Sequence, residues 1–195
     1  MNHLNNSPYH IILASQSPRR QMLLAEAGIK FEVRVIPTAE TYPESLDRDE
    51  IAMYIAGKKA DAFDFDKLPE KALIITADTI VWLNGESIGK PADALEAKAM
   101  LHKLSGNTHI VSTGVCLKTA DKVRLFYVNT AVTFRTLTQD EISFYVEKYK
   151  PFDKAGAYGV QEWIGYVGVE RIEGSYTNVM GLPVQRVYVE LKNFI

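Results

Sequence analysis

Long hydrophobic runs are missing from the 195-residue sequence, and cysteine is almost absent. No apolar stretch approaches the roughly 20 residues of a membrane-spanning helix, so we expect no membrane partner. The first residues, Met1 to Tyr9, are polar and lack the apolar core of a signal peptide. The single Cys116 cannot form an internal disulfide, and its valine-rich surroundings predict a buried thiol. We therefore expect a protein of the cytoplasm, where thiols stay reduced.

A strong charge of one sign is also lacking. The 22 basic and 24 acidic side chains leave a formal net charge of -2. Without a basic field, extended nucleic acid is not an expected partner, whereas a small anionic ligand needs only a local basic cluster. Hydrophobic residues at 47% and charged residues at 24% are ordinary for a globular protein. The length fits one domain over residues 1–195.

Several common functional motifs are absent. The sequence contains no P-loop, no Gly-x-Gly-x-x-Gly dinucleotide fingerprint, no nucleophile elbow and no zinc motif. The histidines show no metal-ligand spacing, so we expect surface or hydrogen-bonded side chains at His3, His10, His102 and His109.

Strand and helix patterns alternate along the chain. Apolar runs predict strands at 11–13, 31–36, 72–77, 80–83, 110–117, 123–134 and 167–172. Caps and helical periodicity predict helices that begin at Pro18, Asp47, Ala92, Thr138 and Pro183, with Ala94, Ala97, Leu101 and Leu104 as the inward face of the third. Asn-Gly at 84–85 predicts a hairpin. This alternation indicates an α/β fold with a twisted mixed β-sheet flanked by helices.

The segment from Ser15 to Arg20 joins an apolar strand to a helix start. Ser17 is a favoured N-cap, and Pro18 suits the first turn because its missing N–H costs nothing there. The open amides of a helix start and the guanidinium groups of Arg19 and Arg20 favour a polyphosphate. The alternative is a capped surface helix whose arginines are merely solvated.

Two charged residues interrupt apolar patterns. Lys59 shares a helical stripe with Ile51 and Ile55, where it either reaches water at the edge of the packing or meets an anion. Asp78 separates two apolar strand segments, and a carboxylate is expensive to bury unless it is paired or bound to a cation. Its alternative role is to cap a local turn. Lys90 follows the hairpin that returns the chain toward Asp78.

Six of the 12 glycines lie between Gly156 and Gly181, so the backbone there turns sharply or approaches something closely. The segment from Asp153 to Gln161 mixes a charge, small residues and an amide, which is typical of a ligand-facing loop. The Gln161 amide offers a donor and an acceptor that can read a base edge.

Taken together, these segments closely resemble the Maf family of nucleotide pyrophosphatases. The matching motifs occur in order over nearly the whole chain: residues 13–20, 77–79, 89–91, 153–161, 173–176 and 179–183. The resemblance implies a single Maf-like domain, similar to inosine triphosphate pyrophosphatases, with two lobes around a central cleft. It also implies hydrolysis of a nucleoside triphosphate to the monophosphate and pyrophosphate with a divalent cation, Mg²⁺ or Mn²⁺.

The resemblance implies a role for each matching position. Asp78 corresponds to the proton acceptor of the catalytic centre, which also includes Lys59 and Glu40, and Glu40 is the candidate metal ligand. The positions that match substrate-binding residues are Ser15, Arg19, Arg20, Thr79, Lys90, Lys154 and Gln161. Among them, Arg19, Thr79 and Gln161 mark the branch that acts on dTTP, UTP and modified pyrimidine triphosphates. The related branch that acts on 7-methyl-GTP lacks the second arginine of the Pro-Arg-Arg triplet, which is residues 18–20 here.

The chain departs from the family pattern at two places. It has Ala39-Glu40 where the family often has an acidic pair, and Lys58 where the family often has an acidic residue. The family has been linked to septum formation and cell-division arrest, so a nucleotide-binding regulator with little turnover is the alternative function. A homodimer is a further expectation from the resemblance.

Overall fold

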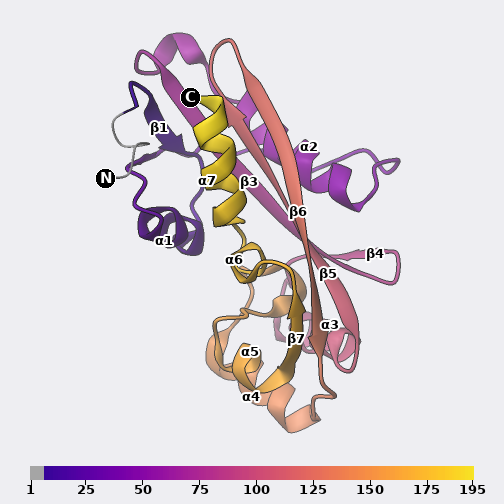
Figure 1. Ribbon diagram of the computed structural model, residues 1–195. Coiled ribbons are helices and arrows are strands. Elements are labelled where there is room, and N and C mark those ends of the chain that lie inside the picture. The colour runs from indigo at the N-terminus through magenta and orange to yellow at the C-terminus, as the bar shows by residue number, and fades with distance from the viewer. Residues whose placement is uncertain (1–6) are drawn as a thin grey trace. The chain divides into compact units, whose positions relative to one another are not determined.

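The computed structural model describes residues 7–195 (Figure 1). The strands are β1 (His10–Leu13), β2 (Glu32–Val33), β3 (Ala72–Leu83), β4 (Glu86–Ile88), β5 (Thr108–Lys118), β6 (Val123–Phe134) and β7 (Val169–Glu173). The α-helices are α1 (Pro18–Glu26), α2 (Arg48–Asp61), α3 (Ala94–Leu104), α4 (Gln139–Tyr149), α5 (Trp163–Gly168), α6 (Tyr176–Val179) and α7 (Val184–Phe194). Two 3₁₀ turns are η2 (Phe65–Lys67) and η3 (Ala155–Ala157).

The strands form a mixed sheet in the order β2-β1-β3-β5-β6-β7, and β4 also pairs with β3. Strand β1 runs parallel to β2 and β3, whereas β4 is antiparallel to β3 and β7 is antiparallel to β6. The predicted α/β fold with a mixed sheet and flanking helices is confirmed.

The chain divides into two compact units. The first comprises the chain up to Asp78 together with Thr113–Val128 and Gly181–Ile195; the second comprises Thr79–Ser112 and Asn129–Met180. The three long strands, β3, β5 and β6, each contribute residues to both units.

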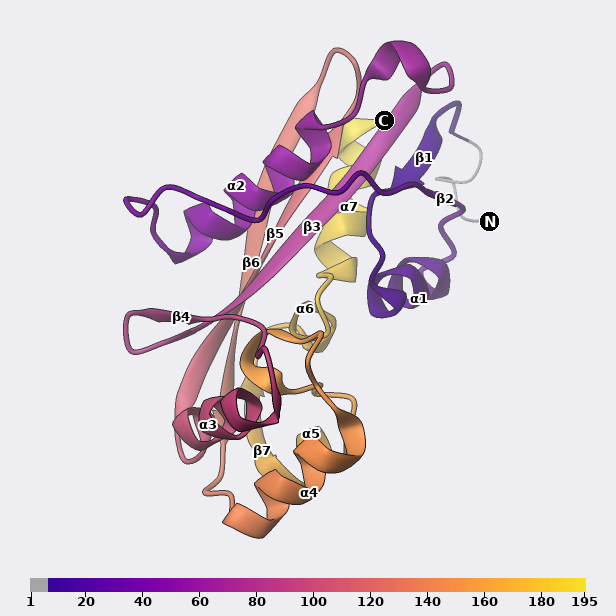
Figure 2. The ribbon, with the colours of Figure 1, turned by 180° about the vertical axis from the view of Figure 1, so that it is seen from behind.

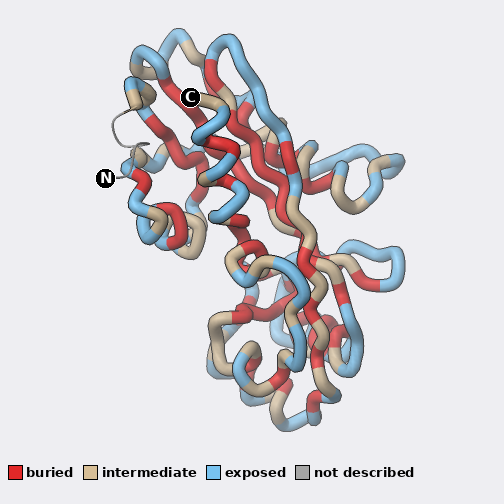
Figure 3. Tube along the Cα trace, in the orientation of Figure 1, coloured by how far each residue is buried: buried red, intermediate tan, exposed pale blue. Residues whose placement is uncertain are grey.

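In the first unit, α2 covers one face of the strands and α7 covers the other (Figures 1 and 2). The buried Thr76 hydroxyl donates to the carbonyl oxygen of Ala56 at 2.6 Å, which ties β3 to α2. Cys116 packs against Ala56 and Ala60, and burial raises the pKa of its thiol to about 12. The predicted buried thiol is confirmed, and Figure 3 shows the buried residues running along these strands.

In the second unit, α3 packs against α4 and η3. An aromatic cluster of His109, Phe134 and Tyr158 lies in the core. His109 Nε2 lies 2.7 Å from the Tyr158 hydroxyl, and burial lowers the pKa of this histidine to about 4. The predicted hydrogen-bonded histidines are also found at His10, beside Glu32, and at His102, beside Gln139. His3 lies outside the described residues.

Several predicted element bounds are wrong. Strand β3 runs unbroken through Asp78, because the carboxylate has a charged partner and does not need a turn. Strand β2 contains Glu32 and Val33 alone of the six residues predicted, since its partner β1 ends at Leu13.

The strand predicted at 167–172 begins later, at Val169, because residues 163–168 form α5. Gly168 closes that helix against Phe134 and Leu137, where an added Cβ would lie 3.0 Å from a Leu137 methyl carbon. On α3 the first residue, Ala94, is exposed, and Met100 takes a buried position instead.

Candidate active site

The loop between β1 and α1 is held by its own hydroxyl groups. Ser17 is the N-cap of α1, and its Oγ accepts a hydrogen bond from the Arg20 amide at 3.4 Å. Pro18 is the first helical residue, and Oγ of the buried Ser15 accepts from the Ser17 amide at 3.2 Å. The predicted helix start is confirmed, and it places Arg19 and Arg20 in the first turn.

Arg20 binds two backbone carbonyl groups. Its Nε donates to the oxygen of Gly181 at 2.7 Å, and its Nη1 donates to the oxygen of Ala77 at 2.8 Å. Burial lowers the pKa of the guanidinium, and the negative charge of Asp78 opposes that shift. Since arginine remains protonated in proteins, a fixed positive charge lies beside the middle of β3, where Asp78 is located.

Lys59, in the last turn of α2, contacts two carboxylates. Its Nζ lies 2.7 Å from Asp78 Oδ1 and 2.7 Å from Glu40 Oε1. The side chains of Lys59 and Asp78 are 17% and 11% exposed. Of the two roles open to a lysine on the apolar stripe, the structure therefore shows the one in which it meets an anion.

The surroundings of Asp78 make its carboxylate more basic than that of a surface aspartate. Burial raises the pKa of Asp78, whereas the charges of Lys59 and Arg20 lower it, and the effect of burial is the larger. A buried carboxylate with a raised pKa, next to two cations, is a typical arrangement for a group that accepts a proton.

The connection that carries Glu40 is fixed by a residue that sequence reasoning missed. Lys58 Nζ donates to the carbonyl oxygen of Thr41 at 3.1 Å and to its hydroxyl at 3.0 Å. Successive residues of a helix point about 100° apart, and the two lysines hold neighbouring residues of the same connection, Lys58 at Thr41 and Lys59 at Glu40. The sequence offered one sign of this contact, because Lys58 stands where the family often has an acidic residue.

In the second unit, the predicted ligand-facing loop contains two consecutive residues in the left-handed region, Gly156 at φ 70° and Ala157 at φ 56°. Lys154 is buried, and its Nζ lies 2.8 Å from Asp153 Oδ1 and 3.2 Å from Glu162 Oε1. Sequence reasoning missed Glu162, whose position beyond the motif gave no sign of this contact.

Three further predicted positions have these places in the structure. Arg19 is partly exposed on α1, Thr79 follows Asp78 in β3, and Lys90 is exposed after β4. Gln161 ends the loop, and its Oε1 is buried with no hydrogen-bond partner in the part of the chain that the structure describes. A buried acceptor without a donor is costly, which makes Gln161 a candidate for contact with a ligand.

Among residues 7–195, no group of three or more His, Cys, Asp or Glu side chains is arranged to hold a metal ion. Glu40 and Asp78 nevertheless meet at one ammonium group. Magnesium commonly binds through one or two carboxylates with waters and substrate phosphates completing the shell. The two carboxylates thus fit a cation that arrives with a nucleotide. No helix within the described residues is long and apolar enough to cross a membrane.

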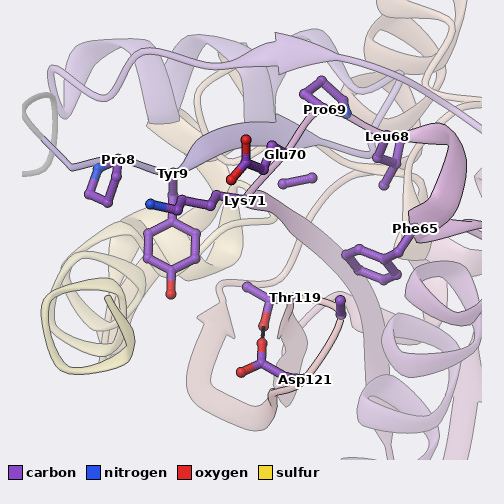
Figure 4. A pocket seen from close by; sticks show the side chains of 11 residues that line it. Pro8, Tyr9, Phe65, Leu68, Pro69, Glu70, Lys71, Thr119 and Asp121 are labelled. Carbon is purple, nitrogen blue, oxygen red and sulfur yellow. Dashed lines mark hydrogen bonds between the residues drawn. The ribbon is translucent and has the colours of Figure 1, made fainter.

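A separate pocket of about 450 Å³ lies in the first unit (Figure 4). It is formed by the chain before β1, the segment from η2 to β3, and the turn between β5 and β6. Thr119 donates its hydroxyl to Asp121 at 2.8 Å in its wall. The residues predicted to bind a nucleotide are not part of its lining.

Comparisons with known proteins agree with the motifs. The family model described as Maf-like protein matches residues 10–194. A relative from Phocaeicola vulgatus named dTTP/UTP pyrophosphatase is 57% identical over 189 residues, covering 96% of this chain and 97% of the relative. Relatives of the same name from Parabacteroides distasonis and Flavobacterium psychrophilum are 56% and 51% identical, covering 97% and 94% of this chain and 98% and 93% of theirs. The chain therefore belongs to the Maf family.

Proposed function

We propose that the protein hydrolyses dTTP, UTP and modified pyrimidine triphosphates to the monophosphate and pyrophosphate. The observation that carries the proposal is the buried Asp78 carboxylate at 2.7 Å from Lys59. The printed name of the relatives, at 48–57% identity, supports the substrate class.

In the proposed reaction, Asp78 accepts a proton from the water that attacks the α phosphorus. Water is a weak nucleophile at neutral pH, so a positioned base of raised pKa assists it. The charge of Lys59 opposes the rise in the pKa of Asp78, and its ammonium holds Glu40 at the same centre. The departing pyrophosphate leaves with its own negative charge, which nearby cations stabilise.

We assign the phosphates to Ser15, Arg19, Arg20 and Lys90. A triphosphate carries several negative charges, and guanidinium forks bind its oxygens in pairs. Because Arg20 already donates two bonds to backbone carbonyls, its position is fixed before a nucleotide arrives.

We assign base recognition to Thr79, Lys154 and Gln161. Uracil and thymine carry an N3–H donor, whereas cytosine presents an acceptor at N3. The buried Gln161 Oε1 has no donor within the described residues. As an acceptor, it can bind the N3–H of uracil or thymine but not the N3 acceptor of cytosine.

A divalent cation, Mg²⁺ or Mn²⁺, would be held by Glu40, with Asp78 as the neighbouring carboxylate. Such a cation neutralises phosphate charge and orients the substrate. We therefore expect chelation with EDTA to abolish turnover and either cation to restore it. We further propose that the protein acts in the cytoplasm as a homodimer of single-domain subunits.

The proposal is tested by incubating the protein with dTTP, UTP, dCTP, GTP, ITP and 7-methyl-GTP in the presence of Mg²⁺ or Mn²⁺. Pyrophosphate and the monophosphate should form rapidly from dTTP and UTP and slowly from the others. In water enriched in ¹⁸O, the label should appear in dTMP, because attack is on the α phosphorus. Label in the pyrophosphate would contradict the assigned step.

The alternative is a nucleotide-binding regulator of septum formation or cell division. Such a protein would bind dTTP tightly and release no pyrophosphate. The paired Asp78 favours the enzyme, because a carboxylate beside a polyanion weakens binding unless it takes part in the reaction.

A further inference from the structure

A buried hydrogen-bond network anchors the loop of residues 154–161. Tyr145, buried on α4, donates its hydroxyl to Glu162 Oε2 and accepts a hydrogen bond from the Gly159 amide at 3.0 Å. The other carboxylate oxygen of Glu162 lies 3.2 Å from Lys154 Nζ. The network thus holds the loop near its start, at Lys154, and near its end, at Gly159, two residues before Gln161.

The direction of the Tyr145 bond follows from its surroundings. Burial, and then the hydrogen bond to Glu162, raises the pKa of the Tyr145 hydroxyl well above its usual value. The hydroxyl therefore keeps its proton and donates it to the carboxylate, while its lone pair accepts the Gly159 amide.

The Glu162 carboxylate lies so close to the backbone of residue 159 that this network requires a glycine at that position. A Cβ on Gly159 would lie 2.7 Å from Glu162 Cδ and 3.0 Å from both carboxylate oxygens. Glu162 is also the N-cap residue of α5, yet its side chain makes no capping bond. Its carboxylate contacts Tyr145 and Lys154 instead.

The held loop is strained. Ala157 has φ 56°, a conformation that is unfavourable for a residue other than glycine unless its surroundings enforce it. The Gly156 amide donates to the oxygen of Gly89 at 3.0 Å on one side, and the Tyr145 network holds the other. The Gln161 acceptor is therefore set in place before a ligand donor reaches it.

Lys154 is poorly placed to attract phosphate. Its ammonium already contacts the carboxylates of Asp153 and Glu162. A phosphate oxygen would have to compete with these two carboxylate oxygens for the same ammonium. The geometry instead gives Lys154 a structural partner in Glu162.

We propose that Tyr145, Glu162 and Lys154 are positioning residues for base recognition. They fix the Gly159 backbone and the Gln161 amide against the N3–H edge of a uracil or thymine ring, and Lys154 acts through Glu162 without touching the phosphates. The inference rests on the proposed hydrolysis of dTTP and UTP.

The first test is Tyr145→Phe, with Tyr149→Phe as the matched control. Tyr149 lies one turn further along α4 and stacks on Tyr145, and its hydroxyl makes no hydrogen bond within the described residues. In Tyr145→Phe, KM for dTTP should rise about five- to tenfold, the worth of one buried hydrogen bond. We expect kcat to stay within about twofold and the preference for dTTP over dCTP to fall in step with the rise in KM. The control should match the wild type.

The second test separates base from phosphate by using inorganic tripolyphosphate as an inhibitor without a base. Lys154→Met should show the same loss of dTTP preference and an unchanged inhibition constant for tripolyphosphate. A weaker inhibition by tripolyphosphate, with the base preference retained, would place Lys154 on the phosphates and overturn the inference.

Two measurements protect these tests from ambiguity. Hydrogen exchange of the amides at 156–161 should accelerate in Tyr145→Phe without any nucleotide, and Glu162→Gln replaces that variant if it does not fold. Wild-type turnover with an unchanged dTTP preference in the variants would overturn the inference and leave the proposed function standing. A wild-type protein that neither binds nor hydrolyses dTTP would overturn both.

Discussion

The ammonium of Lys59 lies 2.7 Å from the Asp78 carboxylate, and the same ammonium lies 2.7 Å from Glu40. The two carboxylates come from a polar connection and from the middle of a long strand, whereas the lysine comes from the last turn of a helix. One cation thus organises two acidic groups that are distant in the sequence. Asp78 is buried with this partner, and its proton affinity depends on it.

Lys59→Met should shift the pH dependence of turnover. Burial raises the pKa of Asp78 and Lys59 opposes that rise, so removing the lysine raises the pKa further. A base must be ionised to act, and kcat/KM therefore falls as the pH drops through this pKa. We expect the acid limb of the kcat/KM profile to move to higher pH.

The control for that profile is Lys58→Met, which removes a neighbouring lysine that donates to Thr41. Its acid limb should stay at the wild-type pH. An unmoved limb in Lys59→Met would show that Asp78 is not the group whose ionisation controls the rate.

Asp78→Asn should stabilise the fold at neutral pH. A carboxyl group whose pKa is raised on folding contributes stability below its unfolded pKa and loses it as the pH rises through the folded value. At pH 7, above the unfolded pKa of an aspartate, the buried Asp78 therefore lowers the free energy of unfolding, and Lys59 still contacts Glu40 in the Asp78→Asn variant. The melting temperature of Asp78→Asn should exceed that of the wild type at pH 7, and the difference should shrink as the pH falls toward 4. An equal difference at both pH values would argue against a raised pKa.

Arg20→Lys and Arg19→Lys should differ in their effects. Arg20 donates through two nitrogens to the carbonyl groups of Gly181 and Ala77, and an ammonium cannot reproduce this fork. We expect both variants to raise KM, and Arg20→Lys to lower the melting temperature more than Arg19→Lys does. Thermal unfolding beside steady-state kinetics separates the two. Equal melting temperatures for both variants would contradict the structural part of the Arg20 role.

Gly114→Ala should displace α2. A Cβ at this β5 residue would lie 2.3 Å from the carbonyl carbon and 2.4 Å from the oxygen of Ala52, which are backbone atoms and cannot rotate away. Overpacking of this kind costs about 1–3 kcal/mol or more, and because α2 carries Lys59, turnover should fall with stability. Denaturant unfolding and dTTP kinetics measure both.

The matched variant is Gly57→Ala on α2 itself. There a Cβ would meet the Leu125 methyl carbons at 3.6 and 3.7 Å, an ordinary contact. Alanine also favours a helix interior over glycine by about 1 kcal/mol. Gly57→Ala should therefore be neutral or stabilising, and destabilisation equal to that of Gly114→Ala would refute the steric explanation.

Local sequence patterns predicted most of the elements, because each pattern carries its own physical cause. Ser17 and Pro18 capped α1, Asp47 and Thr138 each formed a capping box, and Asn84-Gly85 made the hairpin between β3 and β4. The predicted break at Asp78 was wrong because the penalty for a carboxylate in a strand is removed by a partner from α2, which a local pattern does not contain.

The candidate site was predicted as a set of residues, and its internal contacts were not. Lys59 stood out because it interrupts an apolar stripe, yet its two carboxylate partners lie 19 residues away on either side. Tyr145 is a buried residue of α4, and only the folded chain brings its hydroxyl to Glu162 and Gly159. Short-range periodicity identifies a buried position and says nothing of the polar group that meets it there.

The most direct test of the central claim, that Asp78 accepts the proton in nucleotide hydrolysis, is pyrophosphate release from dTTP by Asp78→Asn. Asp66→Asn, at an exposed position in η2, is the matched control. We expect kcat to fall about 10²- to 10⁴-fold in Asp78→Asn, the usual contribution of a general base, while dTTP still binds and the control keeps wild-type turnover. Turnover by Asp78→Asn within about threefold of the wild type, well inside that contribution, would contradict the claim.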